Sequence, residues 1–171
     1  MRIVTVLPVA LLALIVPTLQ AEPPACLTAR AIRKMCADEL EALFRQGSIA
    51  AIPTGTFDGR VLLVVDAKCP RTQAGLQSAI WKGKVISCDG EMINRWCGFR
   101  AVKAPVHLGS SWLDGAPCAV IDYAPDAPVF GNTRDEIREV APGLYLGRFY
   151  EKCPCGKLKG YFLLESRGCA R

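Results

Sequence analysis

The sequence has few of the features that mark well-characterised enzymes or metal proteins. Among its 171 residues there is one histidine, His107. It contains no Gly-x-Ser-x-Gly, no His-Glu-x-x-His and no glycine-rich motif for a phosphate or a dinucleotide. Its closest cysteines, Cys153 and Cys155, are separated by one residue, which does not match the usual spacing of zinc ligands. The sequence therefore predicts no metal site, no cofactor and no catalytic residue of a well-marked class.

Long runs of like charge are also missing. The chain carries 21 lysine and arginine residues and 16 aspartate and glutamate residues, which gives a net charge of +5. These charges are dispersed, and no run of five or more has one sign. Nucleic acids and membrane surfaces attract clustered positive charge, so neither is predicted as a partner.

The first 21 residues have the pattern of a secretory signal peptide. Arg2 precedes an apolar run from residue 3 to residue 19, and Ala21 is a small residue before a polar break. A membrane anchor is the alternative, but Pro8 and Pro17 interrupt the apolar run. We therefore expect residues 1–21 to be removed and the mature chain to be secreted, without stable membrane insertion. The oligomeric state is left open.

Nine cysteines are many for a chain of this length. A domain of about 150 residues buries roughly 68–70% of its unfolded surface and can fold without covalent bridges. In an oxidising compartment, nine cysteines nevertheless predict several disulfide bonds and one sulfur left over. We expect Cys26 and Cys169 to tie down the termini, Cys153 and Cys155 to join separate bridges, and Cys36 to be a free buried thiol.

Residues 22–52 are predicted to form a helical segment. Thr28 can cap a helix that ends at Gly47. Between them, apolar residues recur every three or four positions, opposite a charged side: Ile32, Cys36, Leu40, Leu43 and Phe44. This pattern indicates one amphipathic helix that lies against a sheet. A helix that binds a partner is the alternative, and it would need its apolar stripe exposed.

Residues 53–171 have the pattern of an antiparallel β-barrel. Short apolar and β-branched runs alternate with turn signals, and the expected strands are 60–66, 79–86, 91–99, 100–108, 117–123, 134–140, 144–150 and 159–165. A short helical turn is expected over 73–78, with no second long helix. About eight short strands at meander spacing predict a closed barrel or a sandwich. The expected fold is mainly β, an antiparallel barrel with one N-terminal α-helix.

One hairpin, from Arg134 to Tyr150, is unusually charged. Its two runs are joined by Pro142-Gly143, a turn signal. The first run carries four charged residues among few apolar ones: Arg134, Glu136, Arg138 and Glu139. A strand with charges on both faces is expected at a sheet edge, in solvent, or beside a cavity with a polar end.

Two short motifs resemble a known family. Gly55-Thr56-Phe57-Asp58-Gly59 resembles the Gly-x-Trp-x-Gly signature of a group of small lipocalin-like proteins, with Phe57 in place of the tryptophan. Trp81-Lys82-Gly83-Lys84 resembles the Trp-x-Gly-Lys strand of the same group, and the order of the later elements is similar. The resemblance implies a calycin-like antiparallel barrel. The group itself has no firmly assigned chemistry.

A small barrel of about eight strands either fills with side chains or holds one small ligand. The leading hypothesis is a secreted, lipocalin-like protein that binds a small, largely apolar ligand, with room for an acidic head. Asp122 and Arg138 are candidates for the polar end of the cavity, and an ion pair or a solvated face is the alternative for both. The candidate wall residues, for which plain core packing is the alternative, are Trp81, Trp112, Tyr123, Tyr145 and Phe149.

Two further hypotheses compete with ligand binding. A barrel enzyme, an isomerase or a hydrolase acting on an apolar substrate, would use Asp122 or His107 as acid or base. A secreted interaction or structural module without a pocket would leave the charged hairpin as a wet edge strand. A perturbed carboxylate beside an open pocket would favour the enzyme, and an exposed apolar patch would favour the module.

Overall fold

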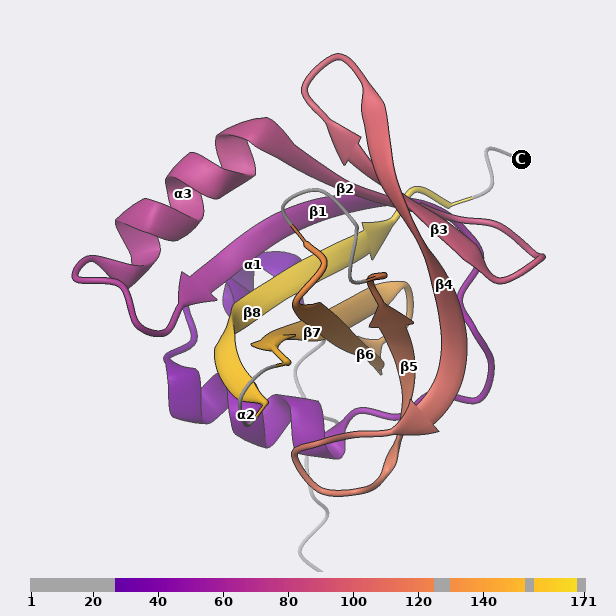
Figure 1. Cartoon of the computed structure of the whole chain (residues 1–171). Helices are drawn as coiled ribbons and strands as arrows, with labels where there is room; N and C mark the ends of the chain where they lie inside the picture. The colour runs from indigo at the N-terminus through magenta and orange to yellow at the C-terminus, as the bar shows by residue number, and fades with distance from the viewer. Residues whose placement is uncertain (1–26, 125–129, 153–155, 169–171) are drawn as a thin grey trace, which may run out of the picture.

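The chain forms a closed barrel of eight antiparallel strands in which each strand pairs with the next and the last pairs with the first (Figure 1). The computed structural model describes residues 27–124, 130–152 and 156–168. The strands are β1 (Gly55–Val64), β2 (Trp81–Ile86), β3 (Glu91–Trp96), β4 (Arg100–Ser110), β5 (Pro117–Asp122), β6 (Thr133–Ala141), β7 (Leu144–Glu151) and β8 (Lys157–Ser166). The predicted mainly β barrel is confirmed.

Two apolar clusters stabilise this barrel, one inside it and one outside. The apolar core inside the barrel draws residues from all eight strands, including Phe57, Trp81, Ile121 and Phe162. The outer cluster joins the N-terminal helices to the outer faces of β1, β7 and β8. Because β8 is covered on both faces, it has five consecutive buried residues rather than an alternating pattern.

The expected single N-terminal helix is two helices, α1 (Ala29–Ile32) and α2 (Ala37–Gln46). The break has a local cause and a distant one. The Glu39 carboxylate accepts a hydrogen bond from the Cys36 amide (2.7 Å), which starts a new helix at Cys36. The Arg71 guanidinium donates to the carbonyls of residues 33–35, which a continuous helix would have used internally. Cys36 is therefore exposed as an N-cap, and its predicted burial is wrong.

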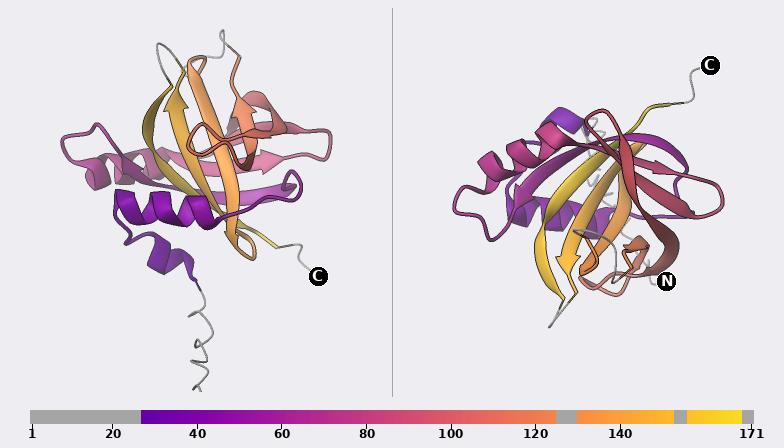
Figure 2. Two further views of the ribbon diagram at one scale, coloured as in Figure 1. Left: turned by 90° about the horizontal axis from the view of Figure 1, so that it is seen from below. Right: turned by 45° about the horizontal axis from the view of Figure 1, so that its top comes forward.

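A third helix, α3 (Pro70–Ile80), replaces the short turn expected over 73–78. Pro70 occupies its first position, where a missing amide hydrogen costs nothing. Only Ala74 of this helix is buried, so the apolar periodicity that announces a helix in a sequence is weak here. Figure 2 shows α3 beside the barrel and α2 lying along its outer surface.

The cysteines do not form the expected bridges within the described part of the chain. Five cysteines are described there and all are free: Cys36, Cys69, Cys88, Cys97 and Cys118. Cys118 is the buried one among them, and burial raises the pKa of its thiol to about 12, so it is an inert core residue. The bridges expected at Cys26, Cys153, Cys155 and Cys169 lie outside the described residues, as does the predicted signal peptide.

Candidate functional site

A cluster of polar side chains lies in the middle of the barrel interior. Lys84 of β2 donates from Nζ to the Asp135 carboxylate (2.9 Å), the Asn94 side-chain oxygen (3.0 Å) and the Tyr123 hydroxyl (2.8 Å). The Tyr123 hydroxyl in turn donates to Asp135 (3.3 Å). All four side chains are almost completely buried, so each polar atom depends on the others for its hydrogen bonds.

Aromatic rings surround the ammonium group of this interior cluster. Lys84 Nζ lies 5.5 Å from the ring centroids of Trp81, Tyr123 and Phe162. The Trp81 indole also donates to the Asn94 side-chain oxygen (3.0 Å). Ring faces attract a cation, and they do so more strongly when water is excluded.

The charge of the interior cluster is balanced. Burial by itself lowers the pKa of Lys84, but Asp135 and Tyr123 outweigh that effect, so its pKa lies above the usual lysine value. Burial beside Asp135 raises the pKa of Tyr123 to about 12. The cluster is therefore a lysine–aspartate ion pair with a neutral phenol.

Backbone irregularities bring these side chains together. A β-bulge between Trp81 and Gly83 breaks the alternation of β2, so that Trp81 and Lys84, three residues apart, both face inward. Gly83 has φ +119° and lies so close to β1 that an added Cβ would be 2.2 Å from the Phe57 carbonyl. At Gly59 a Cβ would meet the Trp81 ring at 2.6 Å. Gly59 and Gly83 thus make room for the Trp81 indole and for the bulge.

Val102 provides a second backbone irregularity, next to Asn94 of the cluster. Its φ of 62° is rare for a β-branched residue. It is the extra residue in the pairing of β3 with β4, because Ile93 pairs with Lys103 and Asn94 with Ala101. The Val102 carbonyl accepts a hydrogen bond from the Asn94 amide (3.2 Å). The strained backbone therefore supplies one acceptor of the interior network.

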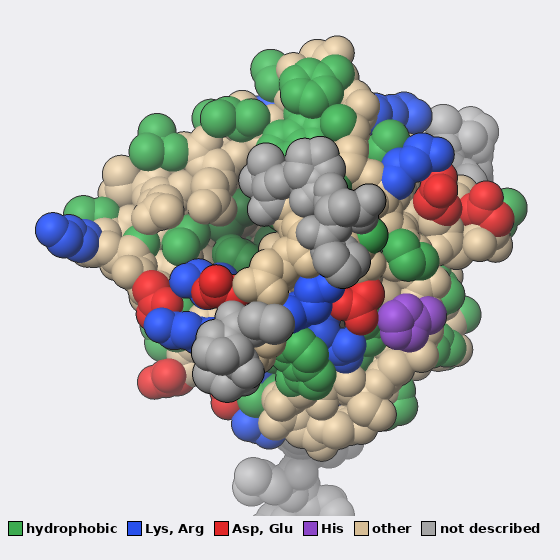
Figure 3. Space-filling view, viewed as in Figure 1, with side chains coloured by type: hydrophobic (Ala, Val, Ile, Leu, Met, Phe, Trp, Pro, Cys, Tyr) green, Lys and Arg blue, Asp and Glu red, His purple; other side chains and the backbone are tan. Residues whose placement is uncertain are grey.

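A column of aromatic rings connects the interior cluster to solvent. Tyr123 stacks on Phe130 (5.3 Å between centroids), Phe130 contacts Trp96 (5.8 Å), and Trp96 stacks on Phe99 (6.3 Å). Phe99, in the β3–β4 hairpin, is 59% exposed. The space-filling view shows hydrophobic side chains at the tip of this hairpin (Figure 3). We call Tyr123, Phe130, Trp96 and Phe99 the aromatic column.

The structure brings some of the predicted wall residues together. Trp81 and Tyr123 meet at Lys84. Phe149 and Tyr145 are half-buried and pack against the apolar core that contains these two rings. Tyr145 contacts Phe57 edge-on at 5.5 Å. Trp81 and Tyr123 belong to a packed core in this structure.

The other three predicted residues lie outside the barrel. Arg138 is buried against the loop between β4 and β5, where its guanidinium forms two hydrogen bonds with Asp114 (2.6 and 2.8 Å). It also donates to the carbonyls of Phe44, Ala116 and Pro117. This fork holds the pKa of Asp114 at about 2. Arg138 therefore fastens a loop and a helix to the outer face of β6.

Asp122 and Trp112 also face outward. Asp122 pairs with Arg134 (3.6 Å) and Lys152 (3.4 Å) rather than with Arg138. Trp112 is 46% exposed and contacts Tyr150 and the Arg134 guanidinium. Glu136, fully buried on the same outer face, accepts hydrogen bonds from Ser111, Trp112 and Arg134. The charged strand β6 is thus not an edge, because the barrel is closed and a loop covers its charges.

The sequence pattern does not single out Lys84, although this residue lies in the Trp81–Lys84 motif. Strict alternation places Trp81 and Lys84 on opposite faces, and only the glycine bulge brings both inside. Gly83 between two charged residues was the available signal, since glycine inside a strand marks a bulge.

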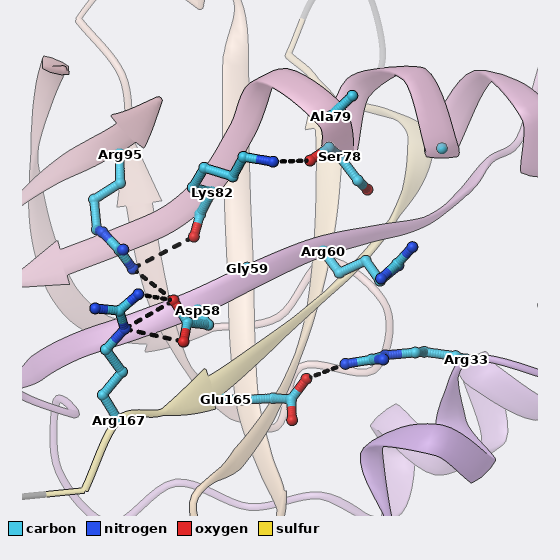
Figure 4. Close-up of a pocket in the computed structure, with 11 residues that line it drawn as sticks. Arg33, Asp58, Gly59, Arg60, Ser78, Ala79, Lys82, Arg95, Glu165 and Arg167 are labelled. Atoms are coloured by element: carbon cyan, nitrogen blue, oxygen red, sulfur yellow. Dashed lines mark hydrogen bonds and ion pairs between the residues drawn. The ribbon is translucent and has the colours of Figure 1, made fainter. Parts of the chain in front are cut away.

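A separate hollow of about 540 Å³ lies outside the barrel, between α3 and strands β1 and β8 (Figure 4). None of the seven predicted residues lines it. Among the described residues, no group of three or more histidine, cysteine, aspartate or glutamate side chains is arranged to hold a metal ion. No described helix is both long and apolar enough to cross a membrane.

Comparisons with known proteins add support for the fold. No protein-family model and no curated protein sequence matches this chain. A solved structure described as a protein from Thermomonospora curvata is similar, with a TM-score of 0.54 and 14% sequence identity. The similarity covers 78% of this chain and 88% of that one. At this identity the likeness concerns the fold alone.

Proposed function

We propose that this protein binds a small, largely apolar ligand at the end of the barrel where the aromatic column reaches solvent. The observation that carries the proposal is the unbroken contact of four rings from exposed Phe99 to buried Tyr123. Ligand sites combine apolar walls with a few polar groups. The column supplies such walls, and the Tyr123 hydroxyl and Lys84 lie at its inner end.

The interior cluster also indicates what the ligand carries. Lys84 already donates to three partners, and Asp135 balances its charge. A carboxylate entering there would have to displace Asp135 and add an unbalanced charge to a dry interior, which is costly. The proposal is therefore a neutral ligand rather than one with an acidic head.

Packing favours the outer part of the aromatic column as the place of binding. Apolar core residues fill the inside of the barrel, where Ile121, Ile137 and Leu164 are fully buried. The half-buried side chains of Trp96 and Phe130 lie at the outer part of the column. The proposed ligand therefore lies among these outer rings, which move aside for it, and its inner end points toward Tyr123 and Lys84.

Native mass spectrometry of freshly purified protein tests the proposal first. A discrete adduct of a few hundred daltons, released on denaturation, is the expected result. A neutral naphthylamine dye provides the second measurement: the double variant W96A/F130A should weaken its affinity by about tenfold, because each aromatic contact contributes about 0.5–1.5 kcal/mol. W112A, which removes an exposed tryptophan outside the barrel, is the matched control. Equal dye affinity in both variants, with no native adduct, would reject the proposal.

Export is part of the same proposal and rests on residues 1–21. Expression in a bacterium followed by N-terminal sequencing of the exported protein should give a chain that begins at Glu22. Retention of the full chain in the cytoplasm would contradict it.

The enzyme hypothesis gains no comparable support. Asp122 is paired with two cations, and His107 is exposed on the face of β4 opposite to interior residues Ala104 and Val106. Neither side chain reaches the aromatic column through a contact in the described structure.

A further inference from the structure

The hollow outside the barrel is lined mainly by charged and very small side chains, and we call it the outer groove (Figure 4). Its volume of about 540 Å³ falls within the roughly 300–1,000 Å³ typical of ligand sites. Its wall contains five cations and two carboxylates: Arg33, Arg60, Lys82, Arg95, Arg167, Asp58 and Glu165.

The carboxylates of the outer groove do not balance its cations. Glu165 pairs with Arg33 (2.5 Å). Asp58 is shared by Arg95 (2.9 Å) and Arg167 (2.8 Å). Five cations less two carboxylates leave an excess of three positive charges.

Two of the groove cations have no carboxylate partner in the described structure. The Lys82 ammonium donates to the Ser78 carbonyl (3.1 Å). Arg60 is exposed, and among the described residues no hydrogen bond or ion pair engages its guanidinium. Both side chains have donors available to a ligand.

Figure 4 shows how the cations are distributed along the outer groove. Arg95 and Arg167 converge on Asp58 at one end, with Lys82 across from them. Arg60 and Arg33 lie toward the other end. The shared Asp58 holds the two guanidinium groups in place before any ligand arrives, which reduces the entropy lost on binding.

The last turn of α3 sets a condition on binding here. Carbonyl oxygens at a helix C-terminus repel an anion. Lys82 covers one of them by donating to the Ser78 carbonyl. The helix face toward the groove carries only small side chains, Gly75, Ser78 and Ala79, and a Cβ added at Gly75 would meet no atom within 4 Å. The space beside Gly75 is therefore open, and one carbonyl of the last helical turn already accepts a hydrogen bond from Lys82.

We propose that the outer groove is a second binding site, separate from the aromatic column, for a small anion with two or more negative charges. Phosphate and carboxylate groups both suit it, because the planar forks of arginine bind either one with two hydrogen bonds. Placement of cations at both ends favours an anion whose charged groups are separated over one that carries them at a single point.

Isothermal titration calorimetry of the purified protein with pyrophosphate and with citrate tests this proposal. The ionic strength is held at about 0.15 M so that long-range electrostatic attraction is screened. Saturable 1:1 binding of at least one probe is expected. The double variant R60Q/K82Q removes the two cations without a carboxylate partner and should weaken that binding by an order of magnitude or more, since hydrogen bonds to charged groups contribute about 1.5–3 kcal/mol each.

Two matched variants make the outcome decisive. R100Q/K68Q removes the same amount of charge from exposed positions outside the groove and should change the affinity less than about twofold. G75L places a side chain into the open space on α3 and should block the probe while the protein stays folded. Equal losses in the two double variants would show general charge attraction and overturn the proposal, as would the absence of saturable binding. The variant W96A/F130A should leave this binding unchanged, so the two sites are tested independently.

Discussion

The barrel interior and the outer groove both contain cationic side chains, but these cations are balanced by carboxylates inside the barrel and not in the groove. Inside, one lysine meets one aspartate, two neutral polar groups and three aromatic rings, and every proton on Lys84 has a partner. Outside, five cations face two carboxylates across an open hollow. Water can solvate an excess of charge at the surface, whereas a dry interior cannot. Balanced charge therefore indicates a role in holding the fold, and unbalanced charge in a concave site indicates a role in binding.

The largest expected effect comes from breaking the interior pair. K84M leaves Asp135 buried without its cation and should lower the free energy of unfolding by about 3–5 kcal/mol, measured by urea denaturation. The double variant K84M/D135L should recover most of the loss, because apolar replacement of both partners is often neutral. A stable K84M single variant would show that the interior charge is not balanced as described.

The outer face of β6 offers an intermediate case, since Arg138 is buried but Asp114 borders solvent. D114N should lower the free energy of unfolding by about 1.5–3 kcal/mol at neutral pH. The pKa of Asp114 is about 2 in the folded protein, below its usual 3.8. Its contribution is complete above pH 3.8 and is lost as the pH falls toward 2. The stability difference between wild type and D114N should therefore close over this range, and a constant difference would contradict the assignment.

A smaller effect of opposite sign is expected at the groove wall. G75A should raise the free energy of unfolding by about 0.5–1 kcal/mol, because alanine favours the helix and its Cβ meets nothing within 4 Å. Thermal unfolding of the two proteins at one pH measures the change. Destabilisation would mean that the hollow beside α3 is filled in solution.

The smallest effect belongs to the unmatched groove cations. R60Q/K82Q should change the free energy of unfolding by less than about 0.5 kcal/mol, since neither side chain is paired with a carboxylate among the described residues. The same denaturation experiment as for K84M gives the direct contrast. A loss of unfolding free energy comparable with that of K84M would show that these cations stabilise the fold, and the contrast between the two regions would then not hold.

The strands were the part of the fold that sequence patterns predict well. Runs such as Arg60–Asp66 and the Pro142-Gly143 turn depend on local composition, and the barrel has strands at each expected place. The helices were predicted less well because their limits depend on distant residues. Arg71 takes the carbonyls that would have continued the first helix, and it lies 36 to 38 residues further along the chain.

The candidate site shows the same division between local and distant causes. Trp81 and Tyr123 are candidates because they are bulky aromatic residues on predicted strands, and they do meet inside the barrel. Arg138 was selected for its charge, but periodicity does not reveal that the loop around Asp114 folds over the outer face of its strand. The sequence does not predict an inward-facing Lys84, because alternation assigns the wrong face when a bulge intervenes.

Closure of the barrel between β1 and β8 has a consequence for how the chain folds. Residues 107 positions apart, such as Asp58 and Glu165, must meet before the last strand pair is complete. Contacts of such long sequence separation form slowly, and until they form two strands keep unpaired edges. We therefore expect the chain to be most prone to aggregation before β8 docks. Loss of the residues beyond Glu151 would leave the edges of β1 and β7 permanently unpaired.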